Sequence, residues 1–137
     1  MTAKEYLGQA YRIDQRINSK LEQLQSLRYL ATKASAVLTT DPISSTRNVH
    51  SMEDVIIKIA DLKSEISADL CQLIDTKREI VTVIKCVENN ELQTLLELRY
   101  LCFKNWEQIA VEMHLDLRWI HRLHNRALNE IDKIRHY

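Results

Sequence analysis

The sequence has 137 residues, with 19 basic and 19 acidic side chains, one glycine and one proline. A chain of this length forms one domain or two small ones, and 45% hydrophobic with 28% charged residues is typical of a globular or coiled-coil protein. One glycine and one proline cannot supply the turns of a many-stranded sandwich or barrel, and they exclude a glycine-rich phosphate-binding loop.

The cysteines and the N-terminal residues indicate in which cellular compartment the protein is expected. Cys71, Cys86 and Cys102 are widely spaced and odd in number, which argues against a disulfide framework. The first residues lack the apolar stretch of a signal peptide, and no uncharged apolar run approaches the ~18 residues of a membrane span. We therefore expect a cytoplasmic protein with reduced thiols and no membrane contact.

Residues 2–38 are predicted to form one long helix. Thr2 and Glu5 have the spacing of a capping box at its start. From Ala3, alternating steps of three and four residues follow an apolar stripe over about five heptads, interrupted by Lys20, while Gly8 lies off it. The apolar members of this stripe are Ala3, Tyr6, Ala10, Ile13, Ile17, Leu24, Leu27, Ala31, Ala34 and Leu38.

Residues 39–51 hold the only proline and many turn formers, which predicts a loop, with Ser51 capping a second helix over 52–88. The same count from Met52 gives a second stripe, interrupted by Asp69 and Thr76, whose other members are Val55, Ile59, Leu62, Ile66, Leu73, Ile80, Val83 and Val87. Two helices of matched length with one stripe each predict an antiparallel, coiled-coil-like helical hairpin at 1–89. A second copy of the chain, or the C-terminal part, is expected to cover the apolar surface left over.

Three shorter helices are expected in residues 90–137. Asn89-Asn90 is expected to end the second long helix and to cap a largely buried helix over 91–103, with the capping-box form at 90–93. Asn105 caps a helix that runs to about Met113, and Asp116 caps the last helix, at about 117–134. The predicted fold class is therefore all-α, with the hairpin at 1–89 followed by a three-helix domain at 90–137.

Residues 105–126 have the apolar pattern of a helix-turn-helix, with the small Ala110 where the two helices touch. The other apolar positions are Ile109, Met113, Leu115, Ile120 and Leu123. His114 stands where the turn often has glycine, and histidine tolerates the left-handed conformation better than most residues. We therefore predict that the turn is made at His114.

The zero net charge hides a local field. Residues 91–116 hold five acidic side chains against two basic ones, whereas residues 117–126 hold Arg118, Arg122 and Arg126 and no acid. Steps of four place the three arginines on one helical face, where arginine can bind guanine or phosphate in the major groove. The last helix is therefore the expected recognition helix.

Three segments carry a resemblance: Leu-Glu-Leu-Arg-Tyr at 96–100, Trp-Glu-Gln-Ile-Ala at 106–110 and Ile-His-Arg-Leu-His-Asn-Arg-Ala-Leu at 120–128. They are similar to the fourth region of sigma-70-type factors, which reads promoter DNA, and to phage regulators of the RinA/ArpU late-transcription type. The whole chain resembles a family of phage and prophage proteins of low-GC Gram-positive bacteria with a long helical N-terminal part. The resemblance implies a sigma-like helix-turn-helix domain at 90–137.

The sigma pattern implies base-reading side chains at Leu117, Arg118 and Arg122, and a backbone contact at His121. Leu117 departs from that pattern, which usually has a basic residue there. The DNA sequence that sigma factors recognise therefore cannot be assigned to this chain. From the residues themselves we expect base contacts from Arg118, Arg122, Asn125 and Trp119, and phosphate contacts from His121 and Arg126.

These observations predict a DNA-binding transcriptional regulator of phage or prophage genes, with double-stranded DNA as its partner. The hairpin is expected to bind RNA polymerase or a second copy, forming a homodimer. No catalytic spacing or metal-ligand cluster is present in the sequence, so we expect no enzymatic activity and no cofactor. Two alternatives stay open: a protein-interaction module without autonomous DNA binding, and a DNA-packaging role like that of a small terminase subunit.

Overall fold

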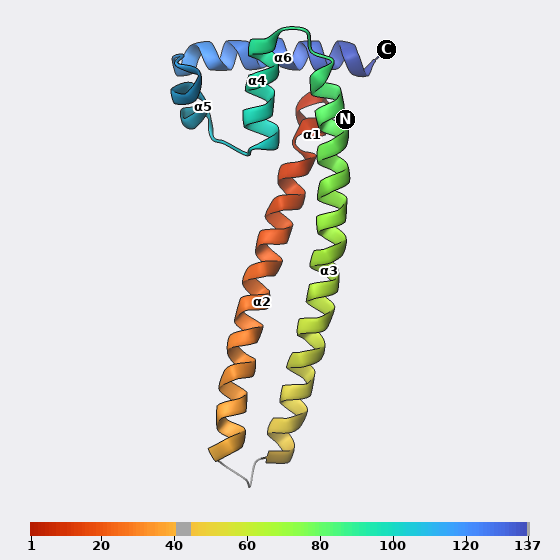
Figure 1. The fold of residues 1–137 in the computed structure, drawn as a ribbon, viewed down its shortest axis with the longest axis vertical. Helices are drawn as coiled ribbons and strands as arrows, with labels where there is room; N and C mark the ends of the chain where they lie inside the picture. The colour runs from red at the N-terminus through yellow and green to blue at the C-terminus, as the bar shows by residue number, and fades with distance from the viewer. Residues whose placement is uncertain (41–44, 137) are drawn as a thin grey trace. The chain divides into compact units, whose positions relative to one another are not determined.

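The computed structural model describes residues 1–40 and 45–136, and the side chains of residues 1–36 and 50–136 (Figure 1). The described residues are all-α and include no strand, as the sequence predicts. The elements are α1 (Ala3–Leu7), α2 (Gln9–Thr40), α3 (Ser45–Lys85), α4 (Asn90–Leu96), the π-helix η1 (Glu97–Leu101), α5 (Trp106–Met113) and α6 (Leu117–Arg135). They group into two compact units, Gln15–Cys71, and Met1–Asp14 together with Gln72–Tyr137.

The unit Gln15–Cys71 is the antiparallel hairpin of α2 and α3 that the two apolar stripes predict. Ile17 and Leu24 of α2 are buried, as are Leu62 and Ile66 of α3. The other apolar members of both stripes in this unit with described side chains are half-buried, whereas positions between the stripes are mostly exposed. Each helix therefore buries a single narrow seam, as heptad spacing requires.

The loop expected over 39–51 is shorter in the structure. Thr39 and Thr40 belong to α2, and α3 begins at Ser45, so the expected cap at Ser51 is wrong. Serine, threonine and asparagine are poor helix formers but do not break a helix, so turn-forming composition alone overestimated the loop. Residues 41–44, which include the proline, and the side chain of Leu38 lie outside the described residues.

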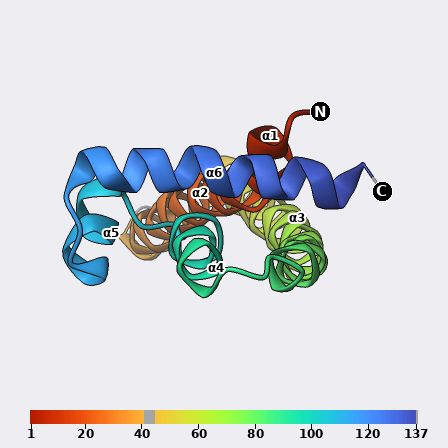
Figure 2. The ribbon, with the colours of Figure 1, turned by 90° about the horizontal axis from the view of Figure 1, so that it is seen from above.

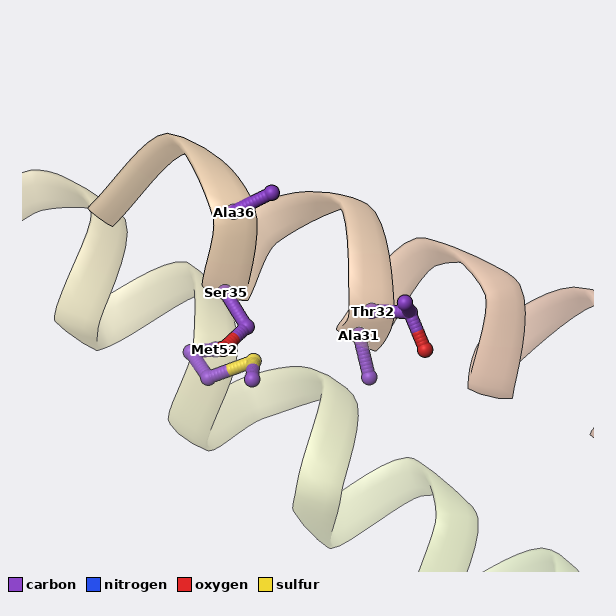
Figure 3. Close-up of a pocket in the computed structure, with 5 residues that line it drawn as sticks. All are labelled: Ala31, Thr32, Ser35, Ala36 and Met52. Carbon is purple, nitrogen blue, oxygen red and sulfur yellow. The ribbon is translucent and has the colours of Figure 1, made fainter. Parts of the chain in front are cut away.

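The end of the hairpin where α2 ends and α3 begins is lined mostly by small side chains. Ala31, Thr32, Ser35 and Ala36 of α2 and Met52 of α3 border a groove of about 420 Å³ (Figure 3). Small side chains bury little apolar area, so this end of the hairpin contributes less to stability than the Leu24–Leu62 region.

The unit formed by Met1–Asp14 and Gln72–Tyr137 has one hydrophobic core. Its buried members come from every element of the unit: Ala3, Leu7, Ala10, Ile80, Ile84, Val87, Leu92, Leu95, Leu96, Tyr100, Ile109, Ile120, Leu123, Ala127 and Ile131. Within this unit α6 lies across α1 and α4 (Figure 2). The boundary expected between residues 89 and 90 stays a prediction about domains, since the contacts group both ends of residues 1–89 with α6.

The chain begins with the predicted capping box. The Thr2 hydroxyl accepts a hydrogen bond from the Glu5 backbone N–H, and the Glu5 carboxylate accepts one from the Thr2 N–H, each at 3.2 Å. Gly8 separates α1 from α2, so the long first helix is bent there. The Arg135 guanidinium lies 4.3 Å from the centre of the Tyr6 ring, which fastens α1 to the end of α6.

The cap of α4 differs from the prediction by one residue. Asn89 is the N-cap, and its side chain accepts the Leu92 N–H at 3.1 Å. Gln93 is then one residue too far along to complete a capping box, and its amide donates instead to the carbonyls of Ile84 and Val87 at 3.3 and 3.2 Å. These two bonds satisfy backbone acceptors near the end of α3.

Candidate nucleic-acid interface

Helices α5 and α6, joined by a short turn, occupy the segment for which the sequence predicts a helix-turn-helix. The Asn105–Gln108 capping box starts α5, and Asp116 starts α6 by accepting the Trp119 N–H at 2.8 Å. His114 adopts the left-handed conformation, with φ 55° and ψ 42°, as predicted. The Leu115 N–H then bonds the Ala110 carbonyl at 3.0 Å, which closes the C-terminal turn of α5 in a Schellman-type cap.

The apolar register of the motif matches the sequence pattern. Ile109 of α5 and Ile120 of α6 are fully buried, and Leu123 is buried beside them. Ala110, Met113 and Leu115 are partly buried and pack against the same core. The packing of α5 on α6 therefore fixes which side of α6 faces away from the core.

Helix α6 has one buried and one exposed side. The buried side chains follow steps of three and four: Ile120, Leu123, His124, Ala127 and Ile131. All six candidate DNA-binding residues are exposed: Arg118, Trp119, His121, Arg122, Asn125 and Arg126. Because an α-helix has 3.6 residues per turn, Arg118, Arg122 and Asn125 point directly away from the buried side, and the other three flank them.

The exposed side of α6 is basic. In the part of the chain that the structure describes, Arg118, Arg122 and Arg126 form no ion pair, so their guanidinium groups are available to a ligand. Trp119 is 40% exposed at the first turn, where its ring is accessible. His121 is also exposed, but its ring lies 5.1 Å from the ring of Trp106, which restricts where it can reach.

Tyr100 and His124 form a buried pair beneath this surface that the sequence did not predict. The Tyr100 hydroxyl and His124 Nε2 share a hydrogen bond of 2.6 Å, joining η1 to α6. Burial lowers the pKa of His124 to about 4, assisted by the charges of Lys4, Arg99 and His121. Burial likewise raises the pKa of Tyr100 to about 12. Both groups are therefore uncharged at neutral pH.

Trp106 completes this cluster. Its ring meets the His124 ring edge-on at 4.5 Å, and the Arg99 guanidinium lies 4.4 Å from its centre. Trp106 is half-buried, in agreement with the expectation from the motif's register that it packs in the core. The cluster holds α6 at a fixed rotation about its axis, and this rotation determines the direction of the exposed arginines. The sequence did carry a signal: His124 shares the spacing of Ile120, Ala127 and Ile131.

Among the described residues, no group of three or more His, Cys, Asp or Glu side chains is placed to hold a metal ion. Cys71, Cys86 and Cys102 are exposed free thiols. None of the helices described combines the length and apolar character needed to cross a bilayer.

A family model whose description is "Protein of unknown function (DUF1492)" matches residues 32–132 of this chain. The match includes most of the hairpin, all of α5 and most of α6. No curated protein and no solved structure matches the chain.

Proposed function

The chain belongs to the DUF1492 family, and we propose that it is a sequence-specific double-stranded DNA-binding protein that reads the major groove with α6. One observation carries the proposal. Three arginines without ion pairs in the described residues, together with Asn125, share the side of α6 that faces away from the core. A major groove of about 12 Å width admits a helix presented in this way.

The exposed side chains suit base and phosphate recognition. Arg118 and Arg122 each carry a planar fork of donors that matches the O6 and N7 acceptors of guanine, and Asn125 can pair with adenine. Arg126 lies one turn further along and suits a phosphate, as does His121. Trp119 offers an aromatic face at the first turn of α6, where apolar contact with a thymine methyl is available.

The biological setting rests on the resemblance to sigma-70-type and RinA/ArpU-type regulators. It favours a non-enzymatic regulator of phage or prophage transcription, acting in the cytoplasm where the DNA is. In this proposal the hairpin binds RNA polymerase or a second copy of the chain, while the helix-turn-helix selects the site. The family itself contributes no function to this argument.

A DNA shift assay tests the proposal, using pooled duplexes of random sequence. The wild-type chain is expected to retard DNA at low salt, and the double variant Arg118→Ala/Arg122→Ala is expected to lose most of this binding. Arg28→Ala is the matched control, because Arg28 is an exposed arginine on α2, outside the helix-turn-helix. Equal binding by the double variant and the control would contradict the assignment of α6 as the DNA-reading helix.

A second candidate function follows from the hairpin. Several large apolar side chains of its two helices are exposed, including Tyr29, Leu30, Ile56 and Ile57. Exposed apolar side chains at this density favour a protein partner. The chain would then be an interaction module without autonomous DNA binding. A polymerase pull-down run beside the shift assay separates the two, since binding only in the pull-down favours this alternative.

A further inference from the structure

A cavity of about 380 Å³ lies among α1, the first turn of α2, η1 and the loop that precedes α5. Its lining includes Lys4, Tyr11, Arg12, Arg99, Tyr100 and Phe103. All of these residues belong to the unit formed by Met1–Asp14 and Gln72–Tyr137. The volume falls within the range of about 300–1,000 Å³ that is usual for small-molecule sites.

The lining of the cavity is cationic. Three of its side chains, Lys4, Arg12 and Arg99, carry positive charge, and Glu5 is the one carboxylate among the lining residues. That carboxylate is engaged at the start of α1, where it accepts the Thr2 N–H at 3.2 Å. Neither Lys4 nor Arg12 forms an ion pair with any residue that the structure describes. The cavity therefore favours an anion.

The other lining side chains are aromatic. The rings of Tyr11 and Phe103 meet edge to face, with centroids 5.5 Å apart, and Tyr11 is 47% exposed. Tyr100 lies deeper and is buried, and because its hydroxyl is bonded to His124 it offers the cavity ring surface rather than a free donor. Aromatic rings in these orientations provide faces and edges on which a planar ligand can pack.

The backbone at the cavity is unusual in two ways. The helix passes into the π-helix η1 at Glu97, and such segments occur frequently at functional sites. Phe103 follows with φ 58°, a left-handed conformation that glycine usually provides and that is costly for a bulky residue. Strain of this kind persists where the surrounding structure demands that side chain. Here the side chain is the ring beside Tyr11, which also lies 4.6 Å from the Lys77 ammonium.

We propose that this cavity binds an aromatic anion of the nucleoside monophosphate class. The phosphate would lie between Lys4, Arg12 and Arg99, where arginine can donate paired hydrogen bonds to it. The base would pack against Tyr11 and Phe103. This site is separate from the exposed side of α6, so the chain would bind a small nucleotide independently of duplex DNA.

The test is titration of the full chain with four nucleoside monophosphates, AMP, GMP, CMP and UMP, beside adenosine and inorganic phosphate. Trp106 provides the readout, since Arg99 both lies over its ring and lines the cavity. The background Trp119→Phe leaves Trp106 as the only tryptophan. At least one monophosphate is expected to change the emission at a concentration about tenfold lower than either adenosine or phosphate alone.

Two variants locate the binding. Arg12→Ala and Tyr11→Ala change exposed side chains, so the fold should persist by circular dichroism, and each is expected to weaken binding about tenfold. Arg28→Ala, on the same helix but in the other unit, is the matched control and should bind like the wild type. Binding by none of the four monophosphates, or equal binding by phosphate alone, would overturn the proposal.

The proposal of DNA binding by α6 and the proposal of nucleotide binding in the cavity can each be contradicted without the other. Arg118→Ala/Arg122→Ala should leave nucleotide binding unchanged, because neither residue lines the cavity. Arg12→Ala should in turn leave the DNA shift unchanged. If Arg118→Ala/Arg122→Ala abolished the nucleotide response, the ligand would be occupying α6 rather than the cavity, and the assignment to the cavity would be wrong.

Discussion

Lys20 and Asp69, the two charged interruptions in the apolar stripes of the hairpin, face each other, with Lys20 Nζ 2.7 Å from Asp69 Oδ2. Their side chains are only 20% and 13% exposed. Arg16 Nε lies 3.7 Å from the same Asp69 oxygen, and Glu65 lies 3.9 Å from Lys20. A charged pair within an apolar seam can specify the register of two helices, because any slip would leave one charge against apolar side chains.

We expect Lys20→Met to destabilise the chain by about 1–3 kcal/mol, because among the described residues Asp69 then keeps only the longer ion-pair contact, with Arg16. The double variant Lys20→Leu/Asp69→Leu should recover that loss or exceed the wild-type stability, since well-packed apolar residues often replace such pairs without cost. Urea denaturation of the three proteins measures both effects. A double variant less stable than Lys20→Met would show that the pair stabilises the seam rather than specifying its register.

The hairpin shows what periodicity can predict. Within the unit Gln15–Cys71, every stripe member with an apolar, described side chain is buried or half-buried, because burial on a long helix follows spacing. In the other unit the stripes miss Leu7 and Ile84, which are more buried than the neighbouring stripe members Tyr6 and Val83. Predicting that Lys20 and Asp69 pair requires knowing the offset between the two helices. The local sequence of either helix does not give this offset. The helix ends near Thr40 and Ser45 were misplaced for another reason, since composition ranks turn formers but does not forbid them in a helix.

Stability should depend on His124 below neutral pH. Its pKa in the folded chain is about 4 against 6.5 for an unperturbed histidine, so the unfolded state binds the proton more tightly between these values. Stability is therefore full above about pH 6.5 and falls by up to about 3 kcal/mol as the pH drops towards about 4.

Comparison with His124→Gln isolates this contribution, because glutamine can still bond Tyr100 but does not titrate. Urea midpoints of both proteins between neutral pH and about pH 4.5 provide the measurement, and the wild type should lose more stability than the variant. Carboxylate titration affects both proteins alike, so parallel curves would refute a neutral, buried His124.

The turn of the helix-turn-helix offers a backbone test. His114 has φ 55°, where a side chain costs about 1–2 kcal/mol and glycine costs none. Glycine also makes the unfolded chain more flexible, which offsets part of this gain. His114→Gly should therefore stabilise the folded chain by about 0.5 kcal/mol, whereas His114→Ala should not. Thermal unfolding gives the ranking. A lower midpoint for His114→Gly than for His114→Ala would argue against the left-handed turn.

The salt dependence of DNA binding should be shallow. The exposed side of α6 carries three arginines, Arg118, Arg122 and Arg126, and the chain as a whole has no net charge. The proposal assigns phosphate contacts to Arg126 and His121, and about two such contacts would give a slope near −2 for the logarithm of the association constant against the logarithm of salt concentration. A slope steeper than about −6 would indicate a larger basic surface than α6 provides.

The exposed residues of the candidate interface could be predicted from the sequence, whereas the buried contacts beneath α6 could not. The spacing of Arg118, Arg122 and Arg126 and the apolar register around Ala110 were enough to separate the exposed from the buried side of α6. The contact of His124 with Tyr100 joins residues 24 apart, and neither glycine nor proline marks the π-helix at Glu97–Leu101. His124 also lies among exposed basic residues in the sequence. A histidine in such a segment is expected on the surface, so its burial in the core was not predicted.

Selection of bound duplexes from a random DNA library, performed with the wild-type chain and with Arg122→Ala, tests the DNA-reading role of α6 most directly. The wild type should enrich a defined sequence, and Arg122→Ala should bind it about 1–3 kcal/mol more weakly and lose preference at one base pair. Arg28→Ala should enrich the same sequence as the wild type. No enrichment by the wild type, or an unchanged preference in Arg122→Ala, would contradict the proposal that α6 reads DNA through this face.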